Sequence, residues 1–474
     1  MEIESTGRGV KRPRNDDAEG PLRDVFISIL DLVPLKDAVR TSVLCRAWRD
    51  LWRERRPDAT VIIEFNPHNN NMEEHLARLE GRKRRHLERF SLVVHAVDKA
   101  TSGALLRRFV DCATECSVED LLIDLRSKSA RYRFTFYFPH SSPLLASLTL
   151  RGLNFSNRLF RGARPFPFLA AIHLHSVGIK DAVLSQVFAL CPGLRSLELI
   201  CCNLLREITI TPPNLRRLIV AECNCLRSMF FAKSTRLRSY RYSGRPISSS
   251  TLYGGSLTDF YICYTTPILG RVSMSNEWFR NTLPLLFNIT ILTICSNALQ
   301  AVSSLRDAGA NAELPNVGNF LSLRELQLLM FEMNAVDLAN IYVFLKICHH
   351  PNLEKLFVQL PTIISEPSEE DLIGMPREEP PPEVGLDKLL LVKIRNFNWG
   401  RYELQLASFL LRKASSMRTL LLVAPRPVPL NELRIEQADI PLVEAALMSG
   451  QLVVVGFLDD PLYRPFHSKV FKHF

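Results

Sequence analysis

Four cysteines in the middle of the chain are of a residue type that binds zinc. Cys201 and Cys202 are followed by Cys223 and Cys225, and closely spaced thiolates are common ligands of structural zinc ions. The offset from Cys202 to Cys223, however, equals the local interval of a sequence repeat, so the two residues occupy equivalent turn positions of successive units. We therefore predict that these cysteines have structural roles and that the chain holds no metal and no cofactor.

Other residues that could carry out chemistry also have simpler explanations. Cys112 and Cys116 lie four apart and continue the apolar face of a predicted helix, so we expect them in the core. His173 and His175 alternate on a predicted strand and should face outward, as surface residues rather than ligands. The sequence contains no G-x-x-x-x-G-K-[ST], G-x-S-x-G, H-E-x-x-H or G-x-G-x-x-G motif. We therefore predict a protein without catalytic activity.

The elements that carry these residues belong to a repeat of the form apolar-x-x-apolar-x-apolar. Two of its copies are LASLTL and LRSLEL, and successive copies lie 20 to 34 residues apart, around the leucine-rich-repeat period of about 20–29 residues. The last apolar residues of the copies are Leu92, Ile123, Leu150, Leu174, Leu199, Val220, Tyr242, Ile262, Ile294, Leu328, Val358, Leu391 and Leu422.

The spacing within each copy predicts a short strand that packs on its neighbours. The last two apolar residues are two apart, so both side chains enter one core. A small polar residue is expected three positions later to bond the turn backbone, as Cys202, Cys223 and Asn297 would. Helical periodicity between strands predicts helices at Leu105–Cys116, Asp181–Leu190, where Asp181 is the expected cap, and Val336–Cys348. The fold class is therefore α/β, a leucine-rich-repeat horseshoe solenoid over 61–360.

Residues 21–56 lie outside the repeat and are predicted to form three short helices. The segment VPLKDAVRTSVLCRAWRDLW, Val33 to Trp52, resembles the plant F-box almost residue for residue, although Pro21-Leu22 inverts a family dipeptide. The resemblance implies an F-box domain over 21–60 that binds a Skp-family adaptor attached to a cullin-RING scaffold. The positions that would form the adaptor-binding face and the small core are Val25, Ile29, Leu32, Pro34, Leu35, Val39, Leu44, Trp48 and Trp52.

The C-terminal part resembles the FBD motif found behind F-box and leucine-rich repeats in plants. The resemblance covers Leu386 to Pro425 and implies a strand at Lys393–Phe397 and a helix from Glu403 to Ala414. We predict that 386–474 caps the solenoid, because a stack of repeats would otherwise expose its core. Residues 361–385, rich in proline and acid, are predicted to be a mobile linker, and residues 66–76 an exposed loop.

Composition and charge restrict the possible partners. The chain has 474 residues, and 59 Lys and Arg against 49 Asp and Glu give a net charge of +10. Basic runs at Lys11–Arg14 and Arg82–Arg85 lack interleaved aromatic residues, which argues against nucleic-acid binding. Residues 1–20 are predicted to be a disordered basic N-terminus without a leader, and no stretch reaches the roughly 18 apolar residues of a membrane span. Eleven scattered cysteines indicate a reduced protein of the cytoplasm, the nucleus or both.

The concave strand face is the expected binding surface of such a solenoid. The central outward position of successive strands carries charged, aromatic and apolar side chains of no single sign, which suits a protein substrate. Arg241, Tyr261 and Phe357 are the strongest candidates because large side chains favour binding hot spots. The full set of predicted substrate contacts is His173, Glu198, Arg241, Tyr261, Gln327 and Phe357.

The resemblance and the repeat together predict a substrate-recognition subunit of an SCF-type ubiquitin ligase, with an unknown protein substrate. One alternative is a hormone-type co-receptor, in which a small molecule fills a deep polar pocket on the concave face. Another is a leucine-rich-repeat scaffold whose F-box no longer binds an adaptor, and the Pro21-Leu22 inversion is the only feature in its favour.

Overall fold

The structure is a computed structural model that divides into two compact units, unit 1 (Met1–Ile172) and unit 2 (His173–Phe474). Each unit is described by itself. The residues whose structure is described are 25, 26, 29, 30, 40, 51, 60–65, 72–81, 87–95, 103–126, 134–136, 142–155, 165–232, 236–250, 252, 255–267, 272–305, 318–362, 381–382, 386–425, 440–460 and 464–467.

Unit 1 contains a parallel sheet in which β1, β2, β3 and β5 pair in that order. Its elements are β1 (Thr60–Phe65), α3 (Met72–Glu80), β2 (Arg89–Val94), α4 (Gly103–Glu115), β3 (Asp120–Leu125), β4 (Thr135–Phe136), β5 (Ser147–Arg151) and β6 (Asn154–Phe155). The Phe65 ring packs 5.7 Å from Phe109 of α4 and 5.5 Å from His75 of α3. The prediction of an exposed loop over 66–76 is therefore wrong from Met72 onward, because Leu76 anchors a helix in the core.

Unit 2 contains a longer parallel sheet in the order β8-β10-β12-β14-β15-β17-β19-β20-β21-β22. The strands of unit 2, including those outside this sheet, are β8 (Ser196–Ile200), β9 (Glu207–Ile210), β10 (Arg217–Ala221), β11 (Ser228–Phe231), β12 (Ser239–Gly244), β13 (Ser248–Ser249), β14 (Asp259–Tyr264), β15 (Ile291–Cys295), β16 (Gly318–Asn319), β17 (Glu325–Leu329), β18 (Cys348–His349), β19 (Lys355–Gln359), β20 (Leu391–Arg395), β21 (Thr419–Val423) and β22 (Leu452–Val455). The point of division falls within β7 (Ala171–His175).

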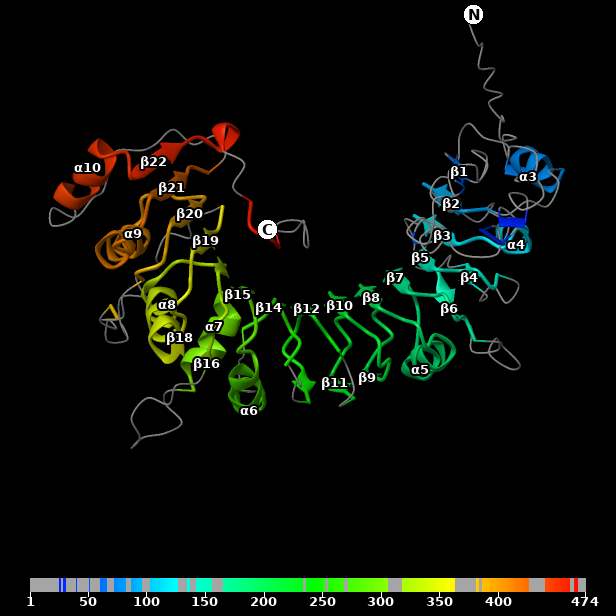
Figure 1. Cartoon of the computed structure of the whole chain (residues 1–474), viewed down its shortest axis with the longest axis horizontal. Helices are drawn as coiled ribbons and strands as arrows, with labels where there is room; N and C mark the ends of the chain where they lie inside the picture. Colours follow the sequence, from blue (N-terminus) through cyan, green and yellow to red (C-terminus); the bar gives the residue numbers. More distant parts are fainter. Residues whose placement is uncertain are drawn as a thin grey trace, which may run out of the picture. The chain divides into compact units, whose positions relative to one another are not determined.

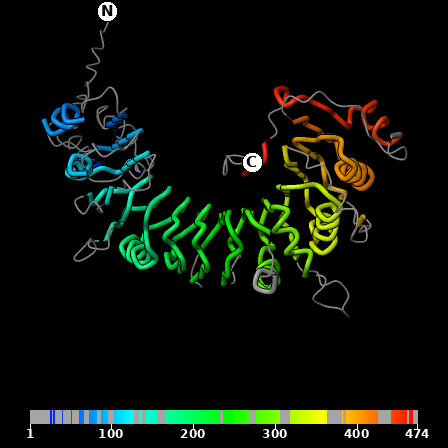
Figure 2. The backbone as a smooth tube through the Cα atoms, turned by 180° about the vertical axis from the view of Figure 1, so that it is seen from behind, coloured from blue at the N-terminus to red at the C-terminus, as the bar shows by residue number. Residues whose placement is uncertain are grey.

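The larger helices of unit 2 lie on one side of its sheet, and residues 464–467 lie on the other side, which we call the inner face (Figure 1; Figure 2 from behind). The helical elements are α5 (Asp181–Leu190), α6 (Val272–Thr282), η5 (Leu283–Leu285), α7 (Ser296–Ser303), α8 (Ala335–Ile347), α9 (Arg401–Lys413), α10 (Ile440–Met448) and η7 (Phe457–Asp459). The predicted helices at 105–116, 181–190 and 336–348 correspond to α4, α5 and α8.

The register of the strands confirms most of the predicted repeat. Leu199 pairs with Val220, which pairs with Tyr242, so the last apolar residues of these copies form one column in the core. The copy assigned to Leu391 is wrong by three residues, because Val358 pairs with Ile394. Leu391 is only half-buried, whereas Ile394 is fully buried. A run of leucines fits the template at more than one offset, and only packing decides between the offsets.

Small polar residues after the strands bond the turn backbone, as predicted. Cys202 Sγ lies 3.7 Å from the Leu174 carbonyl, and Cys223 Sγ lies 3.7 Å from the Leu199 carbonyl. Asn297 donates from Nδ2 to the Tyr264 carbonyl at 2.8 Å. The predicted Asp181 cap is wrong, because α5 begins after Lys180 without a side-chain cap, and the Asp181 carboxylate accepts from the Arg206 amide instead.

The C-terminal strand, helix and strand occur in the predicted order as β20, α9 and β21. Strand β20 ends at Arg395, two residues before the predicted end. Helix α9 begins at Arg401 and is buried through Leu404, Phe409 and Leu410. Within the segment predicted to be a mobile linker, the described residues are Pro361, Thr362, Pro381 and Pro382, and Pro382 is buried. The strand pairing of β1 and β22 extends the repeat beyond the copies that the template found.

Candidate functional site

The central inner-face positions of successive strands in unit 2 lie side by side. The pairing runs from Glu198 on β8, strand by strand, to Lys393 on β20. We call this set the inner-face row, and its members are Glu198, Ile219, Arg241, Tyr261, Thr293, Gln327, Phe357 and Lys393. The register thus brings together five of the six residues predicted as substrate contacts, and His173 on β7 hydrogen-bonds to the first of them.

The inner-face row is open at one end and covered along most of its length. His173 Nδ1 lies 2.9 Å from Glu198 Oε2, and these two side chains keep 35% and 29% of their surface exposed. Hydrogen bonding to His173 holds the pKa of Glu198 below its ordinary value, although burial acts in the opposite direction. By contrast, 94% or more of Arg241, Tyr261 and Phe357 is buried, and Gln327 is similarly buried. The expectation that these large side chains are exposed is therefore wrong.

The chain's own C-terminal residues cover the middle of the inner-face row. We call Arg464–His467 the tail segment. The side chain of His467 is completely buried and packs edge-on against the Tyr261 ring, with 5.6 Å between ring centroids. The Phe466 ring lies 5.5 Å from the Arg241 guanidinium carbon, and the Phe466 amide donates to Glu325 Oε1 at 2.7 Å. The tail segment therefore contacts side chains of β12, β14 and β17.

Asp259 lies at the centre of this contact. Its Oδ1 accepts hydrogen bonds from Ser239 Oγ at 2.8 Å and from Arg241 Nε at 3.3 Å. His467 Nε2 lies 3.1 Å from the same oxygen, and because a carboxylate can only accept, Nε2 carries the proton. On the other side of the ring, His467 Nδ1 lies 2.6 Å from Thr293 Oγ1. Both imidazole nitrogens are thus held by side chains of the sheet.

Burial and hydrogen bonding shift the pKa values of this cluster. Burial would raise the pKa of Asp259, but hydrogen bonds from His467 and Ser239 and the charge of Arg241 outweigh it and hold that pKa below its ordinary value. Burial lowers the pKa of His467 below its ordinary 6.5, and the charges of Arg241 and Arg217 act in the same direction against the effect of Asp259. Burial therefore favours the neutral form of His467 in the docked tail segment.

Docking of the tail segment should weaken in mild acid. The pKa of His467 is lower when docked than when released, so docking has full strength above about pH 6.5 and is lost progressively as the pH falls below it. We expect the hydrogen-exchange protection of the Phe466 amide, corrected for the intrinsic exchange rate, to fall between pH 7 and pH 5. The decrease can reach roughly tenfold for each unit by which the pKa of His467 differs between the docked and the released tail segment. Hydrogen exchange measures this protection.

The control for this prediction is His467→Gln. The substitution removes the titrating imidazole and keeps Glu325, whose own pKa is raised by burial and whose carboxylate accepts from the Phe466 amide. We expect the variant to lose the decrease in protection between pH 7 and pH 5. The same decrease in wild type and variant would contradict the assignment to His467.

A second contact connects the end of the inner-face row to the chain just before the tail segment. The Lys393 ammonium forms a buried ion pair with Asp460, which follows η7. Arg395 Nε lies 3.4 Å from the other oxygen of Asp460, and its guanidinium carbon lies 5.5 Å from the Phe457 ring centroid. Neither contact could be predicted from the sequence, because the residues in contact are 62 or more positions apart in the chain.

The predicted adaptor-binding residues lie in unit 1 and are described only in part. Val25 and Ile29 are in helical backbone and are 53% and 42% exposed, whereas the neighbouring Leu30 is fully buried. The others, Leu32, Pro34, Leu35, Val39, Leu44, Trp48 and Trp52, lie outside the described residues. The three predicted helices of residues 21–56 are therefore not tested as a whole.

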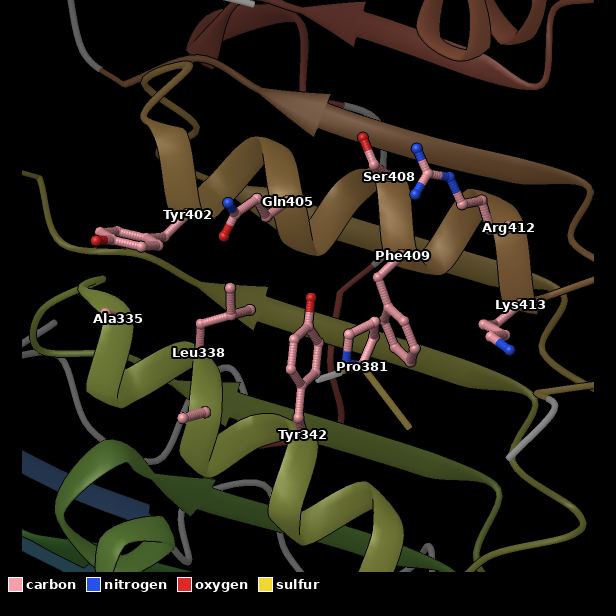
Figure 3. A pocket seen from close by; sticks show the side chains of 11 residues that line it. Ala335, Leu338, Tyr342, Pro381, Tyr402, Gln405, Ser408, Phe409, Arg412 and Lys413 are labelled. Atoms are coloured by element: carbon pink, nitrogen blue, oxygen red, sulfur yellow. The ribbon is translucent and has the colours of Figure 1, made fainter. Parts of the chain in front are cut away.

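A pocket of about 210 Å³ lies between α8 and α9 (Figure 3). Tyr342 and Phe409 line it and pack against one another, with 5.0 Å between ring centroids, and Pro381 lies beside them in the lining. None of its lining residues belongs to the inner-face row, so it is not the concave-face pocket of a hormone-type co-receptor.

Among the described residues, no group of three or more His, Cys, Asp or Glu side chains is placed to hold a metal ion. Within the same ranges, no helix has the length and apolar character needed to cross a bilayer.

Comparison with known protein families finds a leucine-rich-repeat domain and an F-box domain in the chain. The family model described as At1g61320/AtMIF1, LRR domain, matches residues 79–451, and the F-box domain model matches residues 23–59. Since the first match covers most of the chain, the chain belongs to the family of F-box proteins with leucine-rich repeats.

Several relatives from Arabidopsis thaliana match part of the chain. The putative F-box protein At3g44060 is 32% identical over 187 residues, 37% of this chain and 42% of its own length. The putative F-box/LRR-repeat protein At3g18150 is 26% identical over 41% of this chain and 40% of its own length. The FBD-associated F-box protein At5g38590 is 26% identical over 42% of this chain and 48% of its own length. Each match spans less than half of the relative, and the FBD motif of this chain stays a prediction.

Proposed function

We propose that this chain is the substrate-binding subunit of an SCF-type ubiquitin ligase. Its F-box would bind a Skp-family adaptor, which a cullin-RING scaffold carries, and its leucine-rich repeats would bind a protein substrate. The observation that supports this proposal is the order of the two domain matches, an F-box followed by repeats over most of the chain. The chain would contribute proximity rather than chemistry, by holding substrate lysines near a ubiquitin-charged enzyme.

The described part of the F-box supports the adaptor contact. Val25 and Ile29 both have helical backbone, and both side chains are exposed although apolar. Leu30, which also has helical backbone, is buried. Exposed apolar side chains that lie close together in the sequence favour a protein partner. The scattered cysteines fit the reducing cytoplasm or nucleus, where we place this activity.

Adaptor binding tests the proposal. We expect the full chain to bind a purified plant Skp-family adaptor in calorimetry, and Val25→Asp with Ile29→Asp to weaken binding at least tenfold, because two charges would be buried without partners at the interface. The matched control is Leu204→Asp, an equally apolar residue of unit 2 that is 49% exposed. We expect it to bind like wild type.

Two results would contradict this function. One is a folded wild-type chain that does not bind the adaptor, which would favour the scaffold whose F-box is no longer functional. The other is a double variant that keeps its circular dichroism spectrum and binds as tightly as wild type, which would place the adaptor contact elsewhere.

A further inference from the structure

The polar cluster beneath the tail segment is assembled by the sheet itself. Ser239 and Arg241 on β12 hold the Asp259 carboxylate, and Thr293 Oγ1 lies 3.1 Å from Gln327 Oε1 on the next strand. These contacts link strands that are already paired through their backbones. The carboxylate and the hydroxyl therefore keep their positions when the tail segment leaves, and together they form a preorganised site.

The tail segment meets this site as a short peptide would. The tail segment has four residues and forms neither a helix nor a strand. His467 is buried completely, but the Phe466 ring that covers Arg241 is itself 53% exposed and Arg464 is exposed. A segment that buries one side chain and leaves its neighbours in solvent has few contacts to break when it is displaced.

The contacts define what the site recognises. Asp259 requires a hydrogen-bond donor, and the Thr293 hydroxyl requires a second polar atom on the same ring, which an imidazole provides. Arg241 offers its guanidinium to an aromatic face in the preceding residue. Glu325 accepts the backbone amide of that residue, which fixes the direction of the peptide.

We propose that the inner face of β12, β14, β15 and β17 is a binding site for a substrate peptide that presents an aromatic residue followed by histidine, and that Phe466 and His467 fill this site until such a substrate displaces them. The statement that the peptide belongs to a ubiquitination substrate rests on the proposed function. The binding site and its occupation by Phe466 and His467 do not depend on that function. Because a tethered segment has an effective concentration near millimolar, the wild-type site would bind a free peptide weakly.

Peptide binding to the full chain tests this proposal. The probe is a fluorescent peptide with the sequence PLYRPFHSKV, which copies residues 461–470, and anisotropy measures its binding. We expect Phe466→Ala with His467→Ala to bind it at least tenfold more tightly than wild type, because the site is vacated. We expect a peptide with alanine in place of histidine to bind this variant at least tenfold more weakly than the original peptide.

Two controls separate the site from the rest of the C-terminal region. Leu458→Ala alters a side chain of η7 that is 93% exposed, and we expect it to bind the peptide like wild type. Asp259→Asn, added to the Phe466→Ala and His467→Ala variant, removes the carboxylate that accepts from the imidazole. We expect this addition to abolish the gain in peptide affinity.

A second measurement uses the unaltered chain, in case the vacated variant does not fold. We expect an excess of the unlabelled peptide to increase hydrogen exchange of the Phe466 amide in wild type, because the peptide displaces the tail segment. Calorimetry with the adaptor on the same samples distinguishes failure of this proposal from failure of the ligase function. The proposal is overturned by a folded vacated variant that binds no better than wild type, by binding insensitive to the peptide's histidine, or by unchanged exchange of Phe466.

Discussion

Asp259→Asn should lower the free energy of unfolding of unit 2 by about 3–5 kcal/mol, because it leaves buried charge without a partner. The side chain of Arg241 is 7% exposed and its ion-pair partner is Asp259. The substitution removes the negative charge and replaces one oxygen with a donor, so the guanidinium and His467 compete for a weaker acceptor. Chemical denaturation followed by circular dichroism measures this loss.

Asp120→Asn is the matched control. Asp120 is the first residue of β3, as Asp259 is of β14, and it also pairs with an arginine of the preceding strand, Arg89, at 2.8 Å. The Arg89 side chain is 59% exposed, and exposed ion pairs contribute about 0–1 kcal/mol. Equal losses in the two variants would show that the Asp259 cluster is not a buried charge centre.

Tyr240→Ala should destabilise unit 2 by about 3–5 kcal/mol through the cavity that it leaves. Tyr240 is almost fully buried, and its ring stacks 5.8 Å from Phe260 on the next strand and meets Phe231 edge-on at 5.6 Å. These rings belong to successive repeats, so the loss should spread to neighbouring units. The denaturation midpoint and hydrogen exchange of β12 and β14 measure both effects.

The control for Tyr240→Ala is Phe230→Ala. Phe230 lies on β11 next to Phe231, but it is 44% exposed and fills no space in the core. We expect this variant to change the unfolding free energy by less than about 0.5 kcal/mol. A loss at Phe230 as large as that at Tyr240 would contradict the assignment of the core to this column of rings.

The repeat was predictable because it follows from local spacing. An apolar residue at every second position of a strand specifies which face is buried, and this placed Leu199, Val220 and Ile294 in one core. The same rule failed at Leu391, where consecutive leucines satisfy the template at several offsets and Ile394 takes the core position. It also missed β1 and β22, because the leading apolar position of the template is occupied there by Asp58 and Ser449.

The inner face was predictable only in its alignment. The strand period aligned Arg241, Tyr261 and Phe357 in one row, but it carried no information on what covers them. The cover depends on Phe466 and His467, and His467 is 208 residues from Asp259 along the chain. A contact over that separation is decided by tertiary packing, and neither periodicity nor residue type in a segment of four residues signals it.

Co-purification of the full chain with a Skp-family adaptor tests the central claim most directly. We expect a one-to-one complex by mass photometry, both for wild type and for the Phe466→Ala, His467→Ala variant, because the F-box and the inner face are separate sites. A wild-type chain that is folded by circular dichroism and remains alone in the presence of adaptor would rule out the proposed adaptor contact of the F-box.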